Sequence, residues 1–392
     1  MVLLATSQVC SFATAFLFVF FGPFAMIDMG GGAALGGLPF AIAFLATPVA
    51  TIPAGRLMDR VGRAPILAAG HAAGAAGAIA VAAALAGRSA GLLAMAGFLG
   101  GLFLLSAGVS VTYLGRLAAA DLYPPSERAR AISRLVLASF LGSLVGGGVF
   151  NVLSASGEAT PAQGYLAMVP FFVAGAVAML FARRDLVGRG SPGVRGRFVS
   201  VLRRPGVPWV VAGNAGAQGG MGGVMSIASA TLAPMGGMSA AGILVGHFAG
   251  MFLPSPIAGR IADRRSRALA IGAGGLTLAL GALLFTRTDV GLIAGAGLFL
   301  VGAGWCFTYV PGTAVLADAT AVEERGTLFG ANDAIVSVVG ATVVLVAGAA
   351  FAAWGSVGLG VVGAACGLLP LAAGLIVRRP SPRVPQVTPS DP

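Results

Sequence analysis

Charged residues divide this chain into long uncharged stretches, most of which are long enough to cross a lipid bilayer. A transmembrane helix needs about 20 apolar residues, and a charge at the bilayer centre costs about 2.5–3.5 kcal/mol on insertion scales. The stretches 205–259 and 334–377 are long enough for two helices each, with turn signals at Pro234–Gly237 and Trp354–Ser356. Single helices are expected within 1–27, 29–55, 64–87, 89–115, 135–157, 159–182, 268–286 and 290–317. The pattern predicts an all-α membrane protein of twelve transmembrane helices.

The distribution of arginines predicts how the helices are oriented across the membrane. If the N-terminus is cytoplasmic, only Arg88 and Arg287 of the 24 basic residues face the other side. The remaining arginines lie near 55–65, 116–134, 183–207, 259–267 and 318–326 and in the tail after 378. Because cytoplasmic loops are enriched in basic residues, both termini are expected in the cytoplasm of a bacterium, with the chain in the inner membrane. No basic segment or cleavage pattern marks a signal peptide, so the first stretch is expected to be a retained helix.

Composition agrees with a bilayer as the solvent. Hydrophobic residues make up 57% of the chain and charged residues 9%, against about 25% charged in soluble proteins. The net charge of +11 is spread along the chain rather than gathered in one domain, so a nucleic-acid partner is not expected. The three cysteines lie in apolar stretches without metal-ligand spacing, and no lysine is present for a phosphate-binding loop. No cofactor, metal site or catalytic group is expected, and therefore no enzyme.

Two charged motifs occur twice. The first motif, Gly55–Arg60, recurs 204 residues later as Gly259–Arg264. The second motif, formed by Asp121 and Glu127, recurs with the same spacing 197 residues later. Copies that agree in order and topology indicate a tandem duplication into two parallel halves.

The duplication predicts the domain organisation. Six-helix halves are expected at 1–182 and 208–377. A basic segment rich in glycine and proline, 183–207, is expected to be a cytoplasmic linker that either contacts anionic lipid or is merely solvated. The Pro-rich tail, 378–392, is expected to be disordered.

The segment Gly55–Arg63 resembles the signature loop of the major facilitator superfamily, Gly-x-x-x-Asp-Arg-x-Gly-Arg. The resemblance implies a secondary transporter that works by alternating access, and a cytoplasmic gate formed by this loop. In that gate Asp59 faces the start of helix eleven near Thr327. The proposed gate residues are Gly55, Asp59, Arg60, Gly62 and Arg63, with Gly259, Asp263 and Arg264 in the second half. Gly55 and Gly62 are expected to permit a tight turn.

The direction of transport is less clear from the sequence. Proton-driven exporters of this family carry an arginine in helix four, whereas 89–115 has none. Efflux is slightly favoured over uptake. The alternatives are an uncoupled or symport uptake permease and, in another class, a membrane sensor or scaffold that transports nothing.

Ionisable residues within the spans are functional candidates because their burial in a membrane is costly. His247 is either a proton carrier or a neutral histidine bonded to a neighbouring helix. Asp333, beside Asn332, is either a proton or cation site or the partner of a loop arginine or helix terminus. Asp28 either lines a cavity or lies exposed at the outer end of helix one.

Uncharged polar residues extend the candidate set. Asn214 and Gln218 lie in helix seven, Tyr113 in helix four, and Trp305 and Tyr309 in helix ten. Because amides in hydrocarbon need partners, Asn214 and Gln218 are expected to face the interior of the protein, where they either contact substrate or join helices. The expected partners are a small neutral, cationic or amphipathic substrate, protons and membrane lipids, and the protein is expected to be a monomer.

Overall fold

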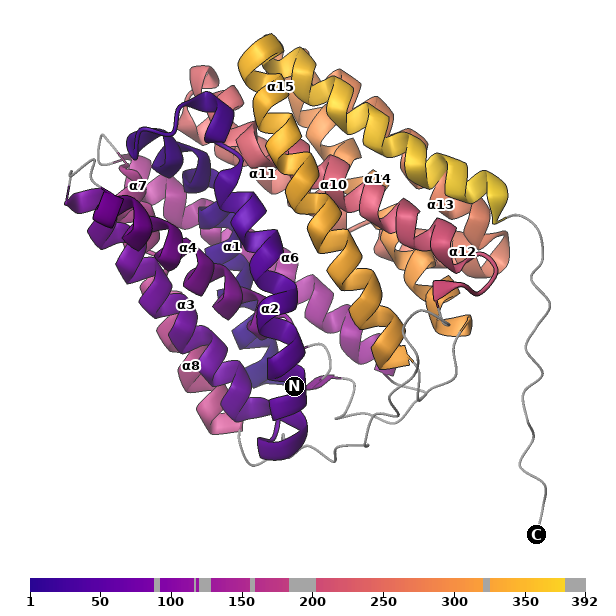
Figure 1. Ribbon diagram of the computed structural model, residues 1–392, viewed down its shortest axis with the longest axis horizontal. Helices are drawn as coiled ribbons and strands as arrows, with labels where there is room; N and C mark the ends of the chain where they lie inside the picture. The colour runs from indigo at the N-terminus through magenta and orange to yellow at the C-terminus, as the bar shows by residue number, and fades with distance from the viewer. Residues whose placement is uncertain are drawn as a thin grey trace.

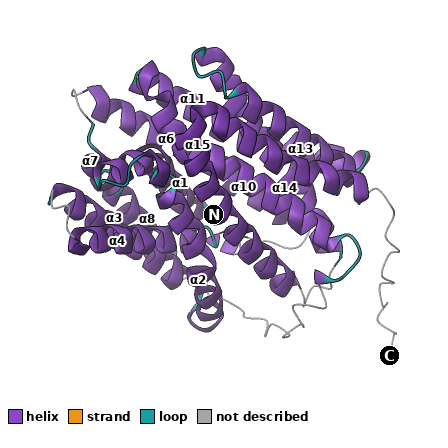
Figure 2. Cartoon of the chain, turned by 45° about the horizontal axis from the view of Figure 1, so that its top comes forward, coloured by secondary structure: helices purple, strands orange, loops and turns teal. Residues whose placement is uncertain are grey.

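The computed structural model describes residues 1–87, 92–115, 118–119, 128–155, 159–182, 202–319 and 325–377. Helices account for almost all of this part of the chain (Figure 2). The elements before residue 202 are α1 (Val2–Asp28), η1 (Ala33–Leu35), α2 (Leu38–Val61), α3 (Arg63–Ala86), α4 (Leu92–Thr112), α6 (Arg128–Ala155), α7 (Pro161–Leu166) and α8 (Val169–Phe181). Those after it are α10 (Val207–Leu232), η3 (Ala233–Met235), α11 (Gly237–Phe252), α12 (Ser255–Arg264), α13 (Arg267–Leu284), α14 (Gly291–Asp318) and α15 (Arg325–Ile376).

Ten helical segments in the described residues are long and apolar enough to cross a membrane. α10 is not among them, although it has 26 residues, because its glycines and amides lower its hydropathy. α15 contributes one segment, yet it bends at Gly355, where φ is +59° and ψ is −144°. The break expected near Trp354–Ser356 is therefore confirmed, as is the one after α10, where α11 begins at Gly237.

Both copies of the first motif, Gly55–Arg60 and Gly259–Arg264, were expected in short loops, and this expectation was wrong. Gly55 lies inside α2 and Gly259 inside α12, and a Cβ on either would meet no atom within 4 Å. No proline or other breaker lies between Gly55 and Val61, so the helix continues past the apolar stretch into its charged end. The turn of the first motif falls on Gly62 alone, whose φ of +95° favours glycine.

Two smaller corrections concern helix ends. α6 begins at Arg128, earlier than the expected 135, because arginines are compatible with a helix that extends beyond the apolar core. The stretch 159–182 is split into α7 and α8, with Pro170 in the first turn of α8.

The helices before and after residue 202 form two groups. In the first group α1 packs on α6 and α8, and α3 on α4; in the second, α10 packs on α15, and α13 on α14 and α15 (Figure 1). Between the groups, α2 contacts α15, α6 contacts α11, and α1 contacts α10. The hydrophobic core extends across both groups.

Glycines allow the closest helix contacts within each group. A Cβ on Gly108 of α4 would lie 2.5 Å from the carbonyl oxygen of Gly70 on α3, and also against Gly74. A Cβ on Gly146 of α6 would lie 2.7 Å from the carbonyl oxygen of Ala13 on α1. Backbones therefore touch at these points, as expected of small residues in membrane proteins.

Candidate functional site

A chain of polar groups joins α10 to α15 in the second group. The amide nitrogen Nδ2 of Asn214 donates to Oδ1 of Asn332 at 3.1 Å, and Nδ2 of Asn332 donates to Oδ1 of Asp333 at 3.2 Å. Both asparagines are buried, whereas Asp333 is half-buried. The structure therefore brings Asn214 together with Asn332, which lies 118 positions later in the chain, and with its neighbour Asp333. The Asn332 amide thus orients the carboxylate of Asp333.

A second cluster lies one helical turn further along α10. Trp305 Nε1 donates to Oε1 of Gln218 at 2.7 Å, and the Trp305 ring stacks on Tyr309 with ring centres 4.7 Å apart and planes at 10°. Residues four apart share one helix face. That spacing relates Gln218 to Asn214 on α10 and Tyr309 to Trp305 on α14.

These side chains are half-buried on helices that lie among other helices. Gln218, Trp305 and Tyr309 all keep partial exposure. α10 is in contact with α1, α11, α14 and α15, so little of its surface is left for lipid. Gln218 on α10 and the rings of Trp305 and Tyr309 on α14 therefore offer one partly accessible amide beside two partly accessible aromatic side chains.

Glycine makes room for Asn214. A Cβ on Gly312 of α14 would lie 2.6 Å from Oδ1 of Asn214, so the amide fits against bare backbone. This oxygen is buried and has no hydrogen-bond partner among the described residues.

The bond between the two asparagines is expected to stabilise the second group. Asn214→Ala should lower the free energy of unfolding by about 1 kcal/mol, because Asn332 then loses its partner. Asn332→Ala should cost a similar amount, and the double variant should cost less than the two single costs added. Equilibrium unfolding in mixed micelles measures these terms. Thr342→Ala is the matched control, since that exposed hydroxyl bonds only within its own helix, to Val338. Strict additivity would contradict the contribution of the bond.

His247 lies apart from these clusters. It is 1% exposed, and its Nδ1 lies 2.8 Å from the carbonyl oxygen of Leu298 on α14. Because a carbonyl only accepts, Nδ1 carries the proton and donates it. The bond joins α11 to α14, and both readings of this residue, a proton carrier and a neutral bonded histidine, remain compatible with a ring in this position.

Tyr113 and Asp28 occupy the ends of their helices. Tyr113 stacks on Phe12 of α1 with ring centres 5.0 Å apart, and Phe12 in turn contacts Phe252 of α11. Tyr113 thus lies close to the boundary between the two groups. Asp28 is exposed at the last position of α1.

Sequence reasoning missed a polar cluster in the first group. Gln8 Nε2 donates to Ser139 Oγ at 2.9 Å, joining α1 to α6. Ser7 Oγ lies 2.7 Å from Nε2 of buried His71, joining α1 to α3. The repeat contained the signal: Gln8 precedes Asp59 by about as many residues as Asn214 precedes Asp263.

The gate residues are only partly visible. The side chains of Asp59, Asp263 and Thr327 lie outside the described part of the structure, so the proposed gate contact stays a prediction. Arg60 and Arg264 are exposed at the ends of α2 and α12. Most of the linker, 183–201, and the tail, 378–392, also lie outside the described residues.

Charged residues that follow Gly259–Arg264, the second copy of the first motif, form an ion pair. Arg267, at the start of α13, donates to the Asp318 carboxylate at the end of α14 and to the carbonyl oxygen of Ala314 at 3.3 Å. Arg204 Nη1 donates to the carbonyl oxygen of Ala319 at 2.7 Å. Two cations therefore lie at the C-terminal end of α14, where the helix dipole favours positive charge. Within the described residues no group of histidine, cysteine or acidic side chains could hold a metal ion.

Two groups of membrane-crossing helices, with polar clusters inside each and apolar contact between them, define a polytopic helical membrane protein. The chain belongs to the Major Facilitator Superfamily, whose family model matches residues 4–343. It is therefore a multi-pass membrane protein of a transporter family.

Relatives and solved structures agree with this assignment. The chain is 28% identical over 336 residues to the uncharacterized MFS-type transporter YdeG of Bacillus subtilis (strain 168), a match that covers 80% of this chain and 76% of YdeG. It is 29% identical over 315 residues to the riboflavin transporter RfnT of Brucella anthropi, covering 76% of this chain and 75% of RfnT. A solved D-xylose-proton symporter has the same fold, with a TM-score of 0.74, 15% identity and 97% of each chain covered.

Proposed function

We propose that the protein is a secondary transporter that carries a planar, uncharged heteroaromatic molecule across the bacterial inner membrane by alternating access. The observation that carries the substrate class is the parallel stack of Trp305 on Tyr309 beside the Gln218 amide. A flat aromatic ligand stacks favourably on such a face, and each aromatic pair contributes about 0.5–1.5 kcal/mol beyond its buried area. The relative named as a riboflavin transporter makes riboflavin the first compound to test.

The residues near the stack favour an uncharged ligand. Asn214, Gln218 and Asn332 offer amide donors and acceptors that suit the carbonyl and ring-nitrogen edges of a heterocycle. The described arginines lie within about two turns of a helix end or between helices, so none is placed to hold an anion midway across the membrane.

Twelve spans with both termini in the cytoplasm are part of this proposal. α10 has 26 residues and so reaches about 39 Å at 1.5 Å per residue, more than the roughly 30 Å of a bilayer core. Counting α10 and both arms of α15 on either side of Gly355 raises the ten spans to twelve. An even number places both termini on one side, and the arginine distribution favours the cytoplasm.

The contacts between the two groups support alternating access. Ala34 and Gly37, next to η1, contact Gly348 and Val344 on α15, and Phe44 contacts Gly340. These contacts lie toward the end where η1 is located, which the orientation places outside the cell. At the opposite end, Gly55 and Gly330 have open space around their Cβ positions. We therefore infer a state that is closed outside, with the gate of Asp59 acting in the other state.

Proton coupling through Asp333 completes the proposal, with efflux as the direction and His247 as the second candidate carrier. Asp333 is a half-buried carboxylate that accepts a hydrogen bond from the Asn332 amide, which makes it the first residue to test for coupling. Asp333 lies next to the buried amides that would respond to a ligand on α10.

Flux of labelled riboflavin into proteoliposomes with an imposed pH gradient tests the proposal. The gradient should increase the initial rate about tenfold, which corresponds to about 1.4 kcal/mol of activation free energy. Asp333→Asn should remove this response, and Asp289→Asn, in an exposed loop, should keep it. If flux ignores the gradient, the protein is an uncoupled permease. If neither riboflavin nor related planar compounds are moved or bound, the proposed substrate class is wrong.

A further inference from the structure

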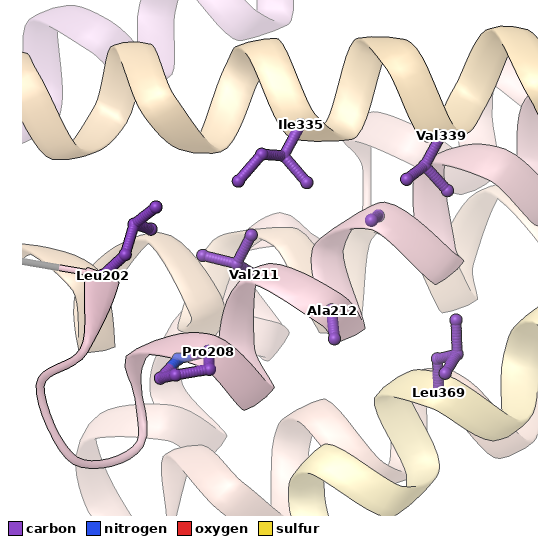
Figure 3. A pocket seen from close by; sticks show the side chains of 8 residues that line it. Leu202, Pro208, Val211, Ala212, Ile335, Val339 and Leu369 are labelled. Carbon is purple, nitrogen blue, oxygen red and sulfur yellow. The ribbon is translucent and has the colours of Figure 1, made fainter. Parts of the chain in front are cut away.

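An apolar crevice lies between α10 and both arms of α15. Its volume is about 360 Å³. Pro208, Val211 and Ala212 line it from α10 (Figure 3). Ile335 and Val339 face them from the first arm of α15, and Leu369 from the second. No charged side chain is among its lining residues.

The crevice opens toward the outside of the helix bundle. Leu369 is 44% exposed, and Pro208 is also exposed. Val211 at its floor is 4% exposed and belongs to the small core at this end of the second group. In a membrane, a crevice with an apolar floor and an open rim is filled by lipid hydrocarbon.

The mouth of the crevice carries interfacial side chains. Leu202 lines the crevice, and the next residue, Arg203, is exposed. Trp209 is 46% exposed on the first turn of α10 and lies three residues before Ala212, on the same face. Tryptophan favours the level of the lipid headgroups. The mouth therefore lies at that level, with a positive charge beside it.

The depth of the crevice fits one leaflet. From Val207, where α10 begins, to Ala215, the last α10 residue of the lining, the helix rises about 12 Å at 1.5 Å per residue. Half of a bilayer core measures about 15 Å. An acyl chain that enters beside Trp209 therefore reaches the end of the crevice without crossing the membrane midplane.

We propose that this crevice holds an acyl chain of an anionic phospholipid of the cytoplasmic leaflet, with the headgroup against Arg203. The leaflet follows from the orientation proposed above, whereas the site is independent of the transported substrate. An arginine at an anionic surface contributes about 1 kcal/mol, and the apolar walls add the burial of the chain. The second arginine, Arg204, is held at the end of α14, which fixes the segment that presents Arg203.

Bromolipid quenching of Trp209 tests this site. Trp305→Phe with Trp354→Phe leaves Trp209 as the only one of three tryptophans. Two vesicle preparations contain equal amounts of phosphatidylglycerol and phosphatidylcholine, with bromine on the chains of one lipid or of the other. Brominated phosphatidylglycerol is expected to quench Trp209 about twofold more than brominated phosphatidylcholine. This difference measures enrichment of the anionic lipid beside the crevice, at the same total bromine content.

Two variants separate the charge from the crevice. Arg203→Gln should remove the preference and leave folding intact, because Arg203 is exposed. Ala212→Phe should fill the crevice and reduce quenching by both lipids. Arg287→Gln, an exposed arginine at the opposite end, is the matched control and should change nothing. Equal quenching by the two lipids in the parent would overturn the proposal, and so would a preference that survives Arg203→Gln. If Ala212→Phe fails to fold, the Arg203→Gln result still decides the matter.

Discussion

Gly108→Val is expected to lower the thermal stability of this protein. Gly108 lies where α4 crosses α3, and a Cβ there would meet the backbone of both Gly70 and Gly74. Side chains can rotate away from a new methyl group, but backbone cannot, so the two helices must separate. Overpacking of this kind costs about 3 kcal/mol or more, which corresponds to a fall in melting temperature on the order of 10 °C. Fluorescence-detected size-exclusion chromatography after heating measures this midpoint.

The same helix supplies the matched control. Gly100 also lies on α4, and a Cβ on it would meet nothing within 4 Å. Gly100→Val therefore changes the helix propensity of α4 as Gly108→Val does, but it leaves the contact with α3 intact. We expect its melting temperature to stay within about 2 °C of the parent, since surface changes usually cost under 0.5 kcal/mol. If the two variants melt alike, the close contact does not hold α3 against α4.

Trp305→Ala is expected to remove most of the affinity for a planar ligand. The change deletes the ring that stacks on Tyr309 and the Nε1 donor to Gln218. Truncating a central aromatic anchor costs about 2 kcal/mol or more, so the dissociation constant should rise about 30-fold. Trp305→Phe keeps a ring but loses the donor, and its loss should be smaller. Isothermal titration of the purified protein with riboflavin measures both constants.

Trp354 provides the control for this substitution. It is 70% exposed beside the bend at Gly355, far along the chain from the stack. Trp354→Ala should leave the affinity unchanged. The melting temperature without ligand, measured for each variant, separates a loss of the site from a loss of the fold. Unchanged affinity in Trp305→Ala would exclude the stack from the binding site.

Much of the architecture could be predicted because the bilayer imposes simple rules. Charges are excluded from the centre of the bilayer, so long uncharged stretches predict helices. The bend at Gly355 and the break before α11 lie where turn residues cluster. The ends of α2 and α12 could not be predicted in this way. A helix that extends out of the hydrocarbon continues into water until a helix-breaking residue ends it. Hydropathy therefore does not predict where such a helix ends.

The polar clusters were predicted by residue type but not by pairing. Amides in a membrane must find partners, and this rule correctly predicted that Asn214 and Gln218 form hydrogen bonds inside the protein. The partner of each amide depends on how the helices are rotated and on gaps such as the one at Gly312. A local sequence pattern predicts neither of these. Gln8 was overlooked for a related reason, because a single amide near the chain start gives no sign of Ser139, 131 positions away.

The interactions that hold helices together within each group differ in kind from those that hold the two groups against each other. The interhelical hydrogen bonds described above join helices of the same group, whereas Phe12 with Phe252 and Phe16 with Phe248 join different groups through their rings. Hydrogen bonds are directional, but ring contacts can exchange neighbours during sliding at little cost. In the alternating access proposed above, sliding along this boundary therefore meets a low barrier, because the ring contacts re-form with new neighbours. A cargo that prefers one arrangement by only about 1.4 kcal/mol changes their ratio tenfold.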